Sequence, residues 1–218
     1  MATVLGAETE AGLRAAGLDL VAEGAEGRRA AVLVGNSRAL WPPFVAWLRR
    51  SPSRAEGPQP LDTYVRETLG SALAGAPVPV LRVVHPTDRD APDFVGLAVR
   101  FGLLWKSPGG LGVHPVFGPW VALRALVVVD APAGPSPPPC PACPHCASAC
   151  GPAFASLPRP ASEAAFRAVW RTWADARSAC PTGAAHRYSD DQLAYHYTHD
   201  RALLRTLARG PSPEGVEP

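Results

Sequence analysis

The sequence predicts a layered domain of the α/β or α+β class that carries a small metal-binding segment. Short apolar runs alternate with helical patterns through the first hundred residues, which is the order typical of such layered folds. The runs at 29–34, 78–84 and 122–129 have the length and composition of buried strands. Four cysteines within 140–150, and a fifth at Cys180, have the spacing of metal ligands. At 218 residues, the chain is long enough for one domain with a substantial core.

The composition is that of a globular protein with few charged positions. Hydrophobic residues make up 47% of the chain, charged residues make up 18%, and the formal net charge is +2. So small a positive charge argues against nucleic acid as a partner. No apolar run approaches the roughly 18 to 20 residues that a bilayer span needs, and the N-terminus lacks the regions of a signal peptide. We therefore expect a cytoplasmic protein with no membrane partner.

Helical patterns lie between the expected strands of the N-terminal half. Residues 8–24 predict a short amphipathic helix followed by a loop. Residues 38–50 and 61–73 carry apolar side chains at helical spacing, and the two prolines near the start of the first segment fit only a first turn. Residues 94–104 repeat the pattern. These helices are expected to cover the sheet.

A glycine-rich loop precedes the third strand. Gly109, Gly110 and Gly112 let the main chain approach a bulky ligand closely, but an ordinary hairpin would use the same residues. The strand that follows is apolar except for Arg124. An arginine in such a run needs an anion or a carboxylate partner, because burying it unpaired is costly.

The C-terminal third is expected to be helical after a stiff link. Residues 131–139 contain five prolines and predict an extended connector. Residues 162–177 predict one helix capped by Ser162, and residues 188–207 predict a last helix whose histidines face solvent. Residues 211–218 are expected to form a frayed, disordered tail.

The cysteines follow the pattern Cys-x2-Cys-x2-Cys-x3-Cys. Iron-sulfur proteins use this run, closed by a Cys-Pro pair, and here the Cys-Pro pair is Cys180-Pro181. Two ligand sets are therefore open: Cys140, Cys143 and Cys146 closed either by Cys150 or by Cys180. Thiolate softness and spacing favour one [4Fe-4S] cluster over structural zinc, and a purely structural or vestigial set of thiols is the third alternative. His145 in the same window could replace a cysteine around zinc, but it is expected to be solvated. The segment carries no Walker, nucleophile-elbow or zinc-protease motif, and neither does the rest of the sequence.

Several motifs together resemble the CblC family of cobalamin-processing proteins. They are Gly112-Val-His114-Pro115-x-Phe117-Gly118-x-Trp120-x-Ala122-x-Arg124, then Trp170-Arg171-x-Trp173, then Arg187-Tyr188-Ser189-x-x-Gln192-x-Ala194-Tyr195. The cysteine run and residues 179–184 are similar instead to epoxyqueuosine reductase, whose cobalamin domain is followed by a ferredoxin module. The chain is too short for the second cluster and helical repeats of that reductase.

The resemblance implies an α+β, nitroreductase-like layered domain with a central, mostly antiparallel sheet flanked by helices. The CblC-like cobalamin-binding part would comprise 1–133 and 160–210, and 134–159 would be a cysteine-rich iron-sulfur or zinc insertion. The resemblance also implies a cobalamin pocket near the His-Pro segment. Its candidate residues are Trp105, Gly109, Gly110, Val113, His114, Pro115, Phe117, Trp120 and Trp173. Arg124, Arg177 and Arg201 correspond to the family arginines that hold glutathione, and they are the catalytic candidates.

The implied reaction is reductive removal of the upper ligand of cobalamin. Decyanation would take electrons through the cluster, and dealkylation would transfer the group to glutathione. Reduced flavin, an electron-donor reductase and a downstream cobalamin-trafficking protein are the implied donor and partners. Two alternatives stay open: a non-enzymatic cobalamin carrier with structural zinc, and a reductase of another substrate that uses cobalamin as its cofactor.

Overall fold

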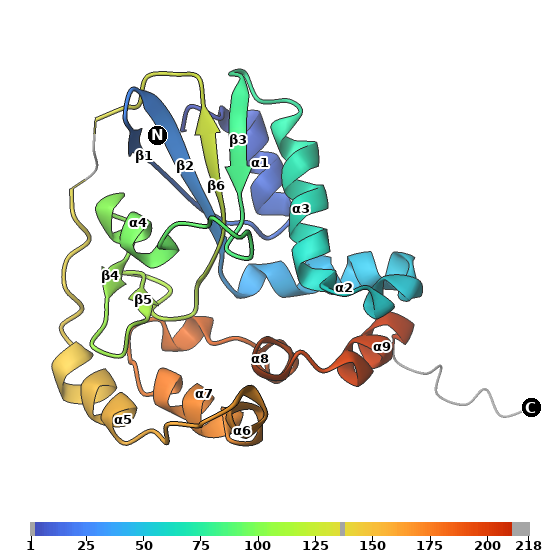
Figure 1. Cartoon of the computed structure of the whole chain (residues 1–218), viewed down its shortest axis with the longest axis vertical. Helices are drawn as coiled ribbons and strands as arrows, with labels where there is room; N and C mark the ends of the chain where they lie inside the picture. The colour runs from blue at the N-terminus through green and yellow to red at the C-terminus, as the bar shows by residue number, and fades with distance from the viewer. Residues whose placement is uncertain (1–2, 136–137, 211–218) are drawn as a thin grey trace, which may run out of the picture.

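The computed structural model describes residues 3–135 and 138–210, which form an α+β fold (Figure 1). Its centre is a four-stranded sheet in the order β1-β2-β6-β3, and each neighbouring pair is antiparallel. The strands are β1 (Leu20–Glu26), β2 (Arg29–Asn36), β6 (Ala122–Val129) and β3 (Val80–Val84). This confirms the predicted central antiparallel sheet flanked by helices.

Helices cover both faces of the sheet. Three of them share a core with one face, and the fourth covers the other face (Figure 1). On the first face lie α1 (Ala7–Ala15), α2 (Trp41–Arg50) and α3 (Pro60–Leu73), and on the second lies α4 (Phe94–Arg100).

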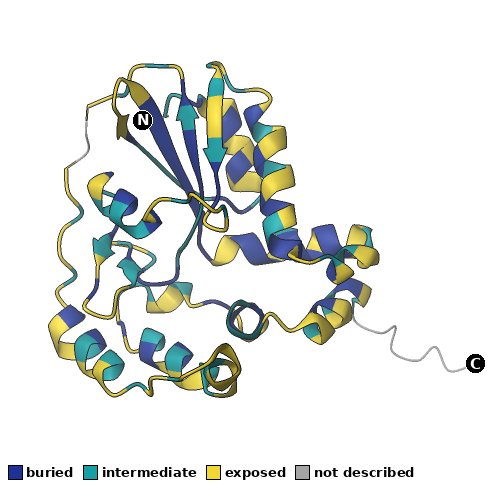
Figure 2. Cartoon of the chain, in the orientation of Figure 1, coloured by how far each residue is buried: buried dark blue, intermediate teal, exposed yellow. Residues whose placement is uncertain are grey.

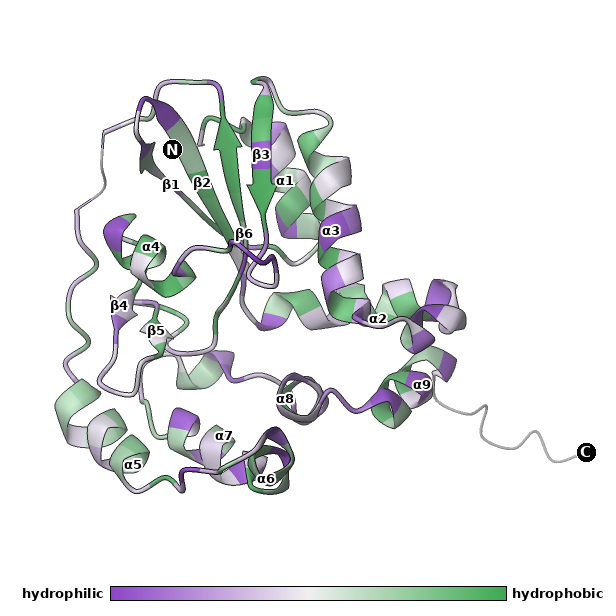
Figure 3. Cartoon of the chain, in the orientation of Figure 1, coloured by the Kyte–Doolittle hydropathy of each residue, from purple (hydrophilic) through white to green (hydrophobic). Residues whose placement is uncertain are grey.

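The two cores alternate along the strands. Val32 and Val34 join the core under α2 and α3, whereas Ala31 and Leu33 join the core under α4. Successive strand residues point to opposite faces, so a continuous apolar run supplies both cores at once. Figures 2 and 3 show this as buried, hydrophobic colouring along β2 and β6.

A second layer of short helices lies below the sheet in Figure 1, and we call α5 to α8 the lower layer. It faces a small hairpin formed by β4 (Trp105–Lys106) and β5 (Gly112–Val113). The last helix, α9, packs against α2 instead. The helices after β6 are α5 (Gly151–Ala155), α6 (Glu163–Ala168), α7 (Trp170–Ser178), α8 (Asp190–Thr198) and α9 (Arg201–Arg209).

The lower layer is thinly buried compared with the sheet. Neither α5 nor α6 contains a buried residue, and α7 buries only two alanines, whereas α8 buries Gln192, Leu193 and Tyr195 (Figure 2). A π turn at Cys146–Cys150 leads into α5, and a 3-10 turn at 184–186 lies between α7 and α8; two further 3-10 turns, at 38–40 and 52–56, flank α2. The stable core therefore belongs to the sheet, and the lower layer is held by fewer apolar contacts.

Two expectations about strands are wrong. Residues 20–26 form β1, where the sequence predicts the end of a helix and a loop, because Leu-Val-Ala-Glu-Gly-Ala-Glu has no clear strand period and is set by its pairing with β2. The predicted strand at 78–84 exists as β3 but is not buried. It lies at the sheet edge and pairs only with β6, so Leu81 is 43% exposed.

Three predicted helices are shorter than expected. The segment 162–177 divides at Val169, whose backbone (φ −112°, ψ 16°) leaves the helical region, although Ser162 does cap the first part. The segment 188–207 divides at His199, which has a left-handed φ of 53°, and Asp200 caps the next helix. The helix in 94–104 ends at Arg100.

The division into a cobalamin-binding part and a cysteine-rich insertion stays a prediction. The predicted connector 131–139 includes residues 136–137, which lie outside the described residues, as does the predicted tail 211–218. Within the described ranges, no helix is long and apolar enough to cross a membrane.

Candidate functional site

An apolar hollow of about 330 Å³ opens between α4, the β4–β5 hairpin and the start of β6. Gly110 and Gly112 of the glycine loop line it, together with Phe94, Leu104 and Leu123. The glycine-rich loop therefore forms an ordinary hairpin turn, and it also lines this cavity. Its volume lies at the lower end of the usual range for small-molecule pockets.

The His-Pro segment forms a tight turn beside this hairpin. The Nδ1 atom of His114 accepts hydrogen bonds from the backbone N–H groups of Val116 (3.1 Å) and Phe117 (3.2 Å), so the neutral ring carries its proton on Nε2. Burial lowers the pKa of His114, and nearby His186 acts in the same direction against Asp19. The ring of Phe117 lies between the two imidazoles, at 4.9 Å from His114 and 4.8 Å from His186.

Two glycines join this turn to the segment after Cys180. Gly118 and Gly183 both have positive φ, 58° and 75°. A Cβ on Gly118 would lie 2.7 Å from the carbonyl carbon of Thr182 and closer still to its oxygen, and a Cβ on Gly183 would overlap Phe117. The two turns therefore pack backbone against backbone, and we call this contact the glycine lock.

Arg177 supports the chain between the hairpin and β6. Its guanidinium donates hydrogen bonds to the carbonyls of Pro119 (Nε, 2.9 Å) and Val121 (Nη2, 3.4 Å). It also lies over the rings of Trp120 (4.6 Å) and Tyr188 (5.0 Å), and it lines the hollow. Its contacts are structural, and one edge of it reaches the cavity.

Arg124 is a cation with no carboxylate partner among the described residues. Its Nε donates to the Asn36 side-chain oxygen at 2.6 Å, while its Nη2 is buried without a partner. Burial lowers its pKa. The backbone carbonyl of the same residue meets Nδ1 of His85 at 2.9 Å. The sequence predicts an anionic partner for Arg124, and the described residues do not supply one.

The buried side-chain polar atoms that lack a hydrogen-bond partner all lie in this region. In the described residues these eight atoms come from 105–124 and 173–196, where the hairpin and the sheet end face the lower layer. They are Trp105 Nε1, Trp120 Nε1, Arg124 Nη2, Trp173 Nε1, Tyr188 Oη, both amide atoms of Gln192, and His196 Nε2. Each buried polar group without a hydrogen-bond partner lowers the stability of the fold by about 1–3 kcal/mol. Their concentration here indicates a region whose polar groups are not satisfied by the described residues.

His196 corrects one expectation, because its Nε2 is buried rather than solvated. Burial lowers its pKa well below the usual value, and the charges of Arg124 and Arg177 add to this effect. Its ring lies 5.4 Å from that of Tyr188. The other histidine of the predicted last helix, His199, lies just after the end of α8 and is exposed as predicted.

Arg201 does not join the other two arginines. It donates to the backbone carbonyls of Glu56 (2.7 Å) and Pro58 (3.2 Å), and it lines a separate hollow at the start of α9. The structure thus brings together two of the three predicted arginines.

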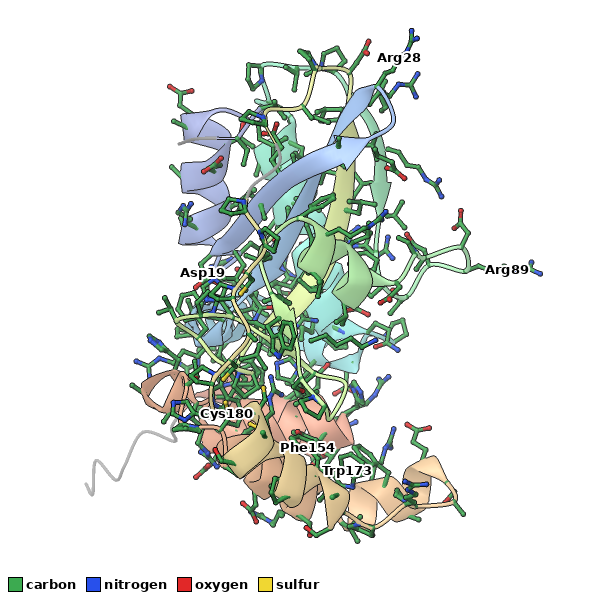
Figure 4. All side chains as sticks on the ribbon, turned by 90° about the vertical axis from the view of Figure 1, so that its left-hand side faces the viewer. Asp19, Arg28, Arg89, Phe154, Trp173 and Cys180 are labelled. Carbon is green, nitrogen blue, oxygen red and sulfur yellow. The ribbon has the colours of Figure 1, made fainter. Side chains whose placement is uncertain are left out.

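The remaining predicted site residues divide between core and surface. Val113 and Trp120 are buried, whereas Pro115, Gly109 and Gly110 are exposed. A Cβ on Gly109 would lie 2.7 Å from the ring of Phe154 in α5, which is 6.5 Å from the ring of Trp173. Figure 4 shows Phe154, Trp173 and Cys180 together in the lower layer.

One solved structure with a similar fold gives this geometry a context. No protein-family model matches the chain, and no curated protein matches it. The crystal structure of the Caenorhabditis elegans B12-trafficking protein CblC, described as a homologue of human MMACHC, aligns with a TM-score of 0.55. The alignment covers 94% of this chain and 89% of that one, at 15% sequence identity. The chain is similar in fold to CblC. This supports the predicted fold class.

All five cysteines are free thiols. Cys146, Cys150 and Cys180 are buried, and Cys140 and Cys143 are partly exposed. Among the described residues, no group of three or more His, Cys, Asp or Glu side chains is arranged so that it could hold a metal ion, so the metal site expected from the cysteine spacing stays a prediction. His145 is exposed, as expected.

Sequence reasoning missed Tyr188, Gln192, Asn36 and Thr182 as members of the site. Gln192 and His196 are four residues apart on one face of α8, and Tyr188 lies four residues before Gln192, just ahead of this helix; this spacing is the signal that could have revealed Tyr188 and Gln192. Asn36 and Thr182 carry no such signal, because their contacts come from distant segments.

Proposed function

We propose that this chain binds cobalamin between the sheet and the lower layer and removes its upper ligand reductively. The observation that carries the proposal is the set of eight unpartnered polar atoms on a surface next to an apolar hollow. The fold similarity to a protein described as B12-trafficking supports the same ligand.

The residues on this surface suit a corrin. Its flat ring is apolar, and its rim carries amide side chains that both donate and accept hydrogen bonds. Three indole N–H groups, the Tyr188 hydroxyl and the Gln192 amide offer matching donors and acceptors, while Leu104 and Phe94 offer apolar walls. A corrin is larger than the 330 Å³ hollow, so binding requires the thinly buried lower layer to move away from the hairpin.

Bound cobalamin would supply a cobalt centre whose upper ligand leaves on reduction. Trp105 and Phe117 would exclude water from it, and the Nε2–H of His114 would donate to a polar group at the pocket rim. Arg124, which has no carboxylate partner in the described chain, would hold the carboxylate of a thiol such as glutathione for the dealkylation. The cysteines would hold an iron-sulfur cluster, whose chemistry would be electron transfer from a reductase or reduced flavin.

The test is corrin binding followed by turnover. Purified protein is titrated with cyanocobalamin and with hydroxocobalamin, and the corrin absorbance is followed under anaerobic conditions with and without a reductant. We expect tight binding with displacement of the lower base, and loss of cyanide only with the reductant present. The double variant His114→Ala and Trp105→Ala should bind at least about tenfold more weakly, which corresponds to about 1.4 kcal/mol.

Arg89→Ala is the matched control. Arg89 is exposed and projects sideways into solvent, away from the labelled residues of the lower layer (Figure 4), so this variant should bind as the wild type does. Unchanged corrin absorbance with the wild-type protein would refute cobalamin binding. Equal affinity in the wild type and the double variant would refute the assigned surface.

A second candidate is a non-enzymatic cobalamin carrier, and the description of the similar structure as a trafficking protein favours it. Turnover separates the two functions. A carrier retains one cyanocobalamin per chain unchanged after reductant is added, and its cysteines contain zinc; an enzyme releases cyanide over repeated cycles.

A further inference from the structure

Arg124 lies at an irregularity in the central sheet. Ala125 of β6 pairs with Val34 of β2, and the next pair along the two strands is Leu123 with Gly35. Arg124 is therefore the extra residue of a β-bulge and has no partner residue in β2. Bulges redirect a side chain out of the regular alternation of a strand, and they are frequent next to active sites.

Asn36, the last residue of β2, holds one edge of this arginine. Asn36 is fully buried, and its side-chain oxygen accepts a hydrogen bond from Nε of Arg124 at 2.6 Å. Its Nδ2 donates to the backbone carbonyl of Ser37, also at 2.6 Å. Because the nitrogen of the amide is bound to that carbonyl, the oxygen is the atom that faces the guanidinium.

Asp19 fixes the main chain that orients the Asn36 amide. One carboxylate oxygen of Asp19 accepts a hydrogen bond from the backbone N–H of Ser37 at 2.7 Å, and the other accepts from the Ser37 hydroxyl. A continuous series of hydrogen bonds therefore leads from Asp19 through Ser37 and Asn36 to Arg124. The direction of the guanidinium is set by this series and by the bulge.

The bonded partner of Arg124 is neutral, although the arginine carries a charge. A buried charge is usually compensated by an opposite one, because burying it alone is costly. An amide oxygen supplies a hydrogen bond but no negative charge. Asp62 is a carboxylate whose charge acts on Arg124, but the two form no ion pair among the described residues. The charge of the guanidinium is therefore left for another anion.

The second edge of the guanidinium lies beside the candidate cavity. Its Nη2 is buried and has no partner in the described residues, and the same holds for the hydroxyl of Tyr188, a residue whose charge acts on Arg124. The ring of Tyr188 lies 5.0 Å from the guanidinium of Arg177, which lines the hollow. Ala122 and Leu123, just before Arg124 in β6, line it as well. An unpartnered charged donor is thus available next to the place where the ligand is proposed to bind.

We propose that Asn36 is a positioning residue, which holds Arg124 through a neutral amide and so leaves the charge and Nη2 of the guanidinium for the carboxylate of a ligand. The inference deepens the proposed function and rests on it in one respect: the ligand is taken to be a thiol that carries carboxylates. Because Asn36 and the bulge fix the guanidinium beforehand, it need not reorganise when the carboxylate binds.

The test compares two ligands that differ in their carboxylates. S-Methylglutathione keeps its carboxylates and has no free thiol to react, whereas in its diethyl ester the carboxylates are blocked. The affinity of the full chain for each ligand is measured by isothermal titration calorimetry, with cyanocobalamin absent and with it present. We expect the wild type to bind the free acid about tenfold more tightly than the ester, or better, in at least one of these conditions, because a hydrogen bond between charged groups is strong.

Two substitutions of Asn36 separate charge from orientation. Asn36→Asp places a carboxylate against Arg124, so it should reduce the preference for the free acid to about twofold or less. Asn36→Ala removes the acceptor but adds no charge, so it should retain part of the preference. Gln59→Glu is the matched control, because it adds the same charge at an exposed position, and it should keep the wild-type preference.

A double-mutant cycle shows whether Asn36 acts through Arg124. Arg124→Gln alone should abolish the preference for the free acid, and adding Asn36→Asp should then weaken binding no further. If Asn36 had only a structural role, the two losses of affinity would multiply instead. Urea unfolding shows whether each variant folds, and if Asn36→Asp does not, Asn36→Ala takes its place in the cycle.

The outcomes distinguish this inference from the proposed function. A wild-type chain that binds cyanocobalamin but binds acid and ester equally, or binds neither, overturns the positioning role alone. An Asn36→Asp variant that keeps the wild-type preference also overturns it. A chain that binds no corrin, yet prefers the free acid and loses this preference in Asn36→Asp, overturns the proposed function and supports the role of Asn36.

Discussion

The glycine lock can be tested with two alanine substitutions. Both place a side chain on a residue with positive φ, but only one of them also pushes a Cβ into neighbouring main chain. Gly118 and Gly110 both have positive φ, 58° and 80°. A Cβ on Gly118 would press into the Thr182 carbonyl, whereas a Cβ on Gly110 would meet no atom within 4 Å. Gly110→Ala therefore measures the conformational cost alone, and Gly118→Ala measures that cost together with the overlap.

The magnitudes follow from these two contributions. A non-glycine residue with left-handed backbone costs about 1–2 kcal/mol, which we expect for Gly110→Ala. Forcing extra volume into a packed contact costs a further ~1–3 kcal/mol, and here the obstacle is main chain, which cannot turn aside as a flexible side chain can. We therefore expect Gly118→Ala to lose about 2–5 kcal/mol of unfolding free energy.

Urea unfolding followed by tryptophan fluorescence measures both variants. Trp120 lies next to Pro119 and Gly118, so its fluorescence also reports loosening of the turn. If the two variants lose the same unfolding free energy to within about 0.5 kcal/mol, the lock contributes nothing and the reasoning is wrong. Gly183→Ala should behave as Gly118→Ala does, because its Cβ would overlap Phe117.

Three other results are expected. Arg177→Gln should lose about 2–4 kcal/mol in urea unfolding, since it removes donors to two backbone carbonyls, whereas the exposed Arg201→Gln should change stability by less than about 1 kcal/mol. Lowering the pH below about 6.5 should destabilise the fold, because His196 has a lowered pKa when folded and the unfolded chain takes up the proton first; His196→Gln should flatten the dependence of Tm on pH. Timed alkylation of metal-free protein, followed by mass spectrometry, should show that Cys143 is modified well before Cys150. Burial raises the pKa of the Cys150 thiol to about 12. At Cys143, hydrogen bonds outweigh burial and lower the pKa, so more of this thiol is present as the reactive thiolate.

The sequence predicts the sheet better than it predicts the lower layer. The apolar run of β2 is continuous from Ala30 to Val34 and that of β6 is interrupted only by Arg124, and such runs are typical of strands that are covered on both faces. Helices α2 and α3 were predicted because their apolar stripes face that sheet. By contrast, β1 carries Glu23 and Gly24 and exists because β2 offers it a partner, which is a tertiary effect that no local pattern contains.

Within the candidate site, the sequence predicts which residue types need a partner, but it does not predict which residues contact one another. The need of Arg124 for an anion follows from one arginine in an apolar strand, and the folded chain indeed supplies it no carboxylate in the described residues. The meeting of the cysteine loop with the turn after Cys180 has no such signal, because the contact of the Cys143 sulfur with the Thr182 hydroxyl (3.3 Å) joins segments that are far apart in the sequence. Spacing along the chain limits which cysteines can share a site, but it does not contain this contact.

The distribution of unpartnered atoms explains why the sheet and the lower layer differ in character. The core under α2 and α3 satisfies its buried polar side chains, as when Tyr64 donates its hydroxyl to the Ala16 carbonyl at 2.8 Å, so it is complete without a ligand. The region facing the lower layer leaves eight buried polar atoms without a partner in the described residues, and each lowers stability by about 1–3 kcal/mol. A ligand that hydrogen-bonds to those atoms would recover this free energy. The glycine lock joins that region to the turn after Cys180. The position of the His114 turn therefore depends on that of the turn after Cys180, because main chain packs directly against main chain between them.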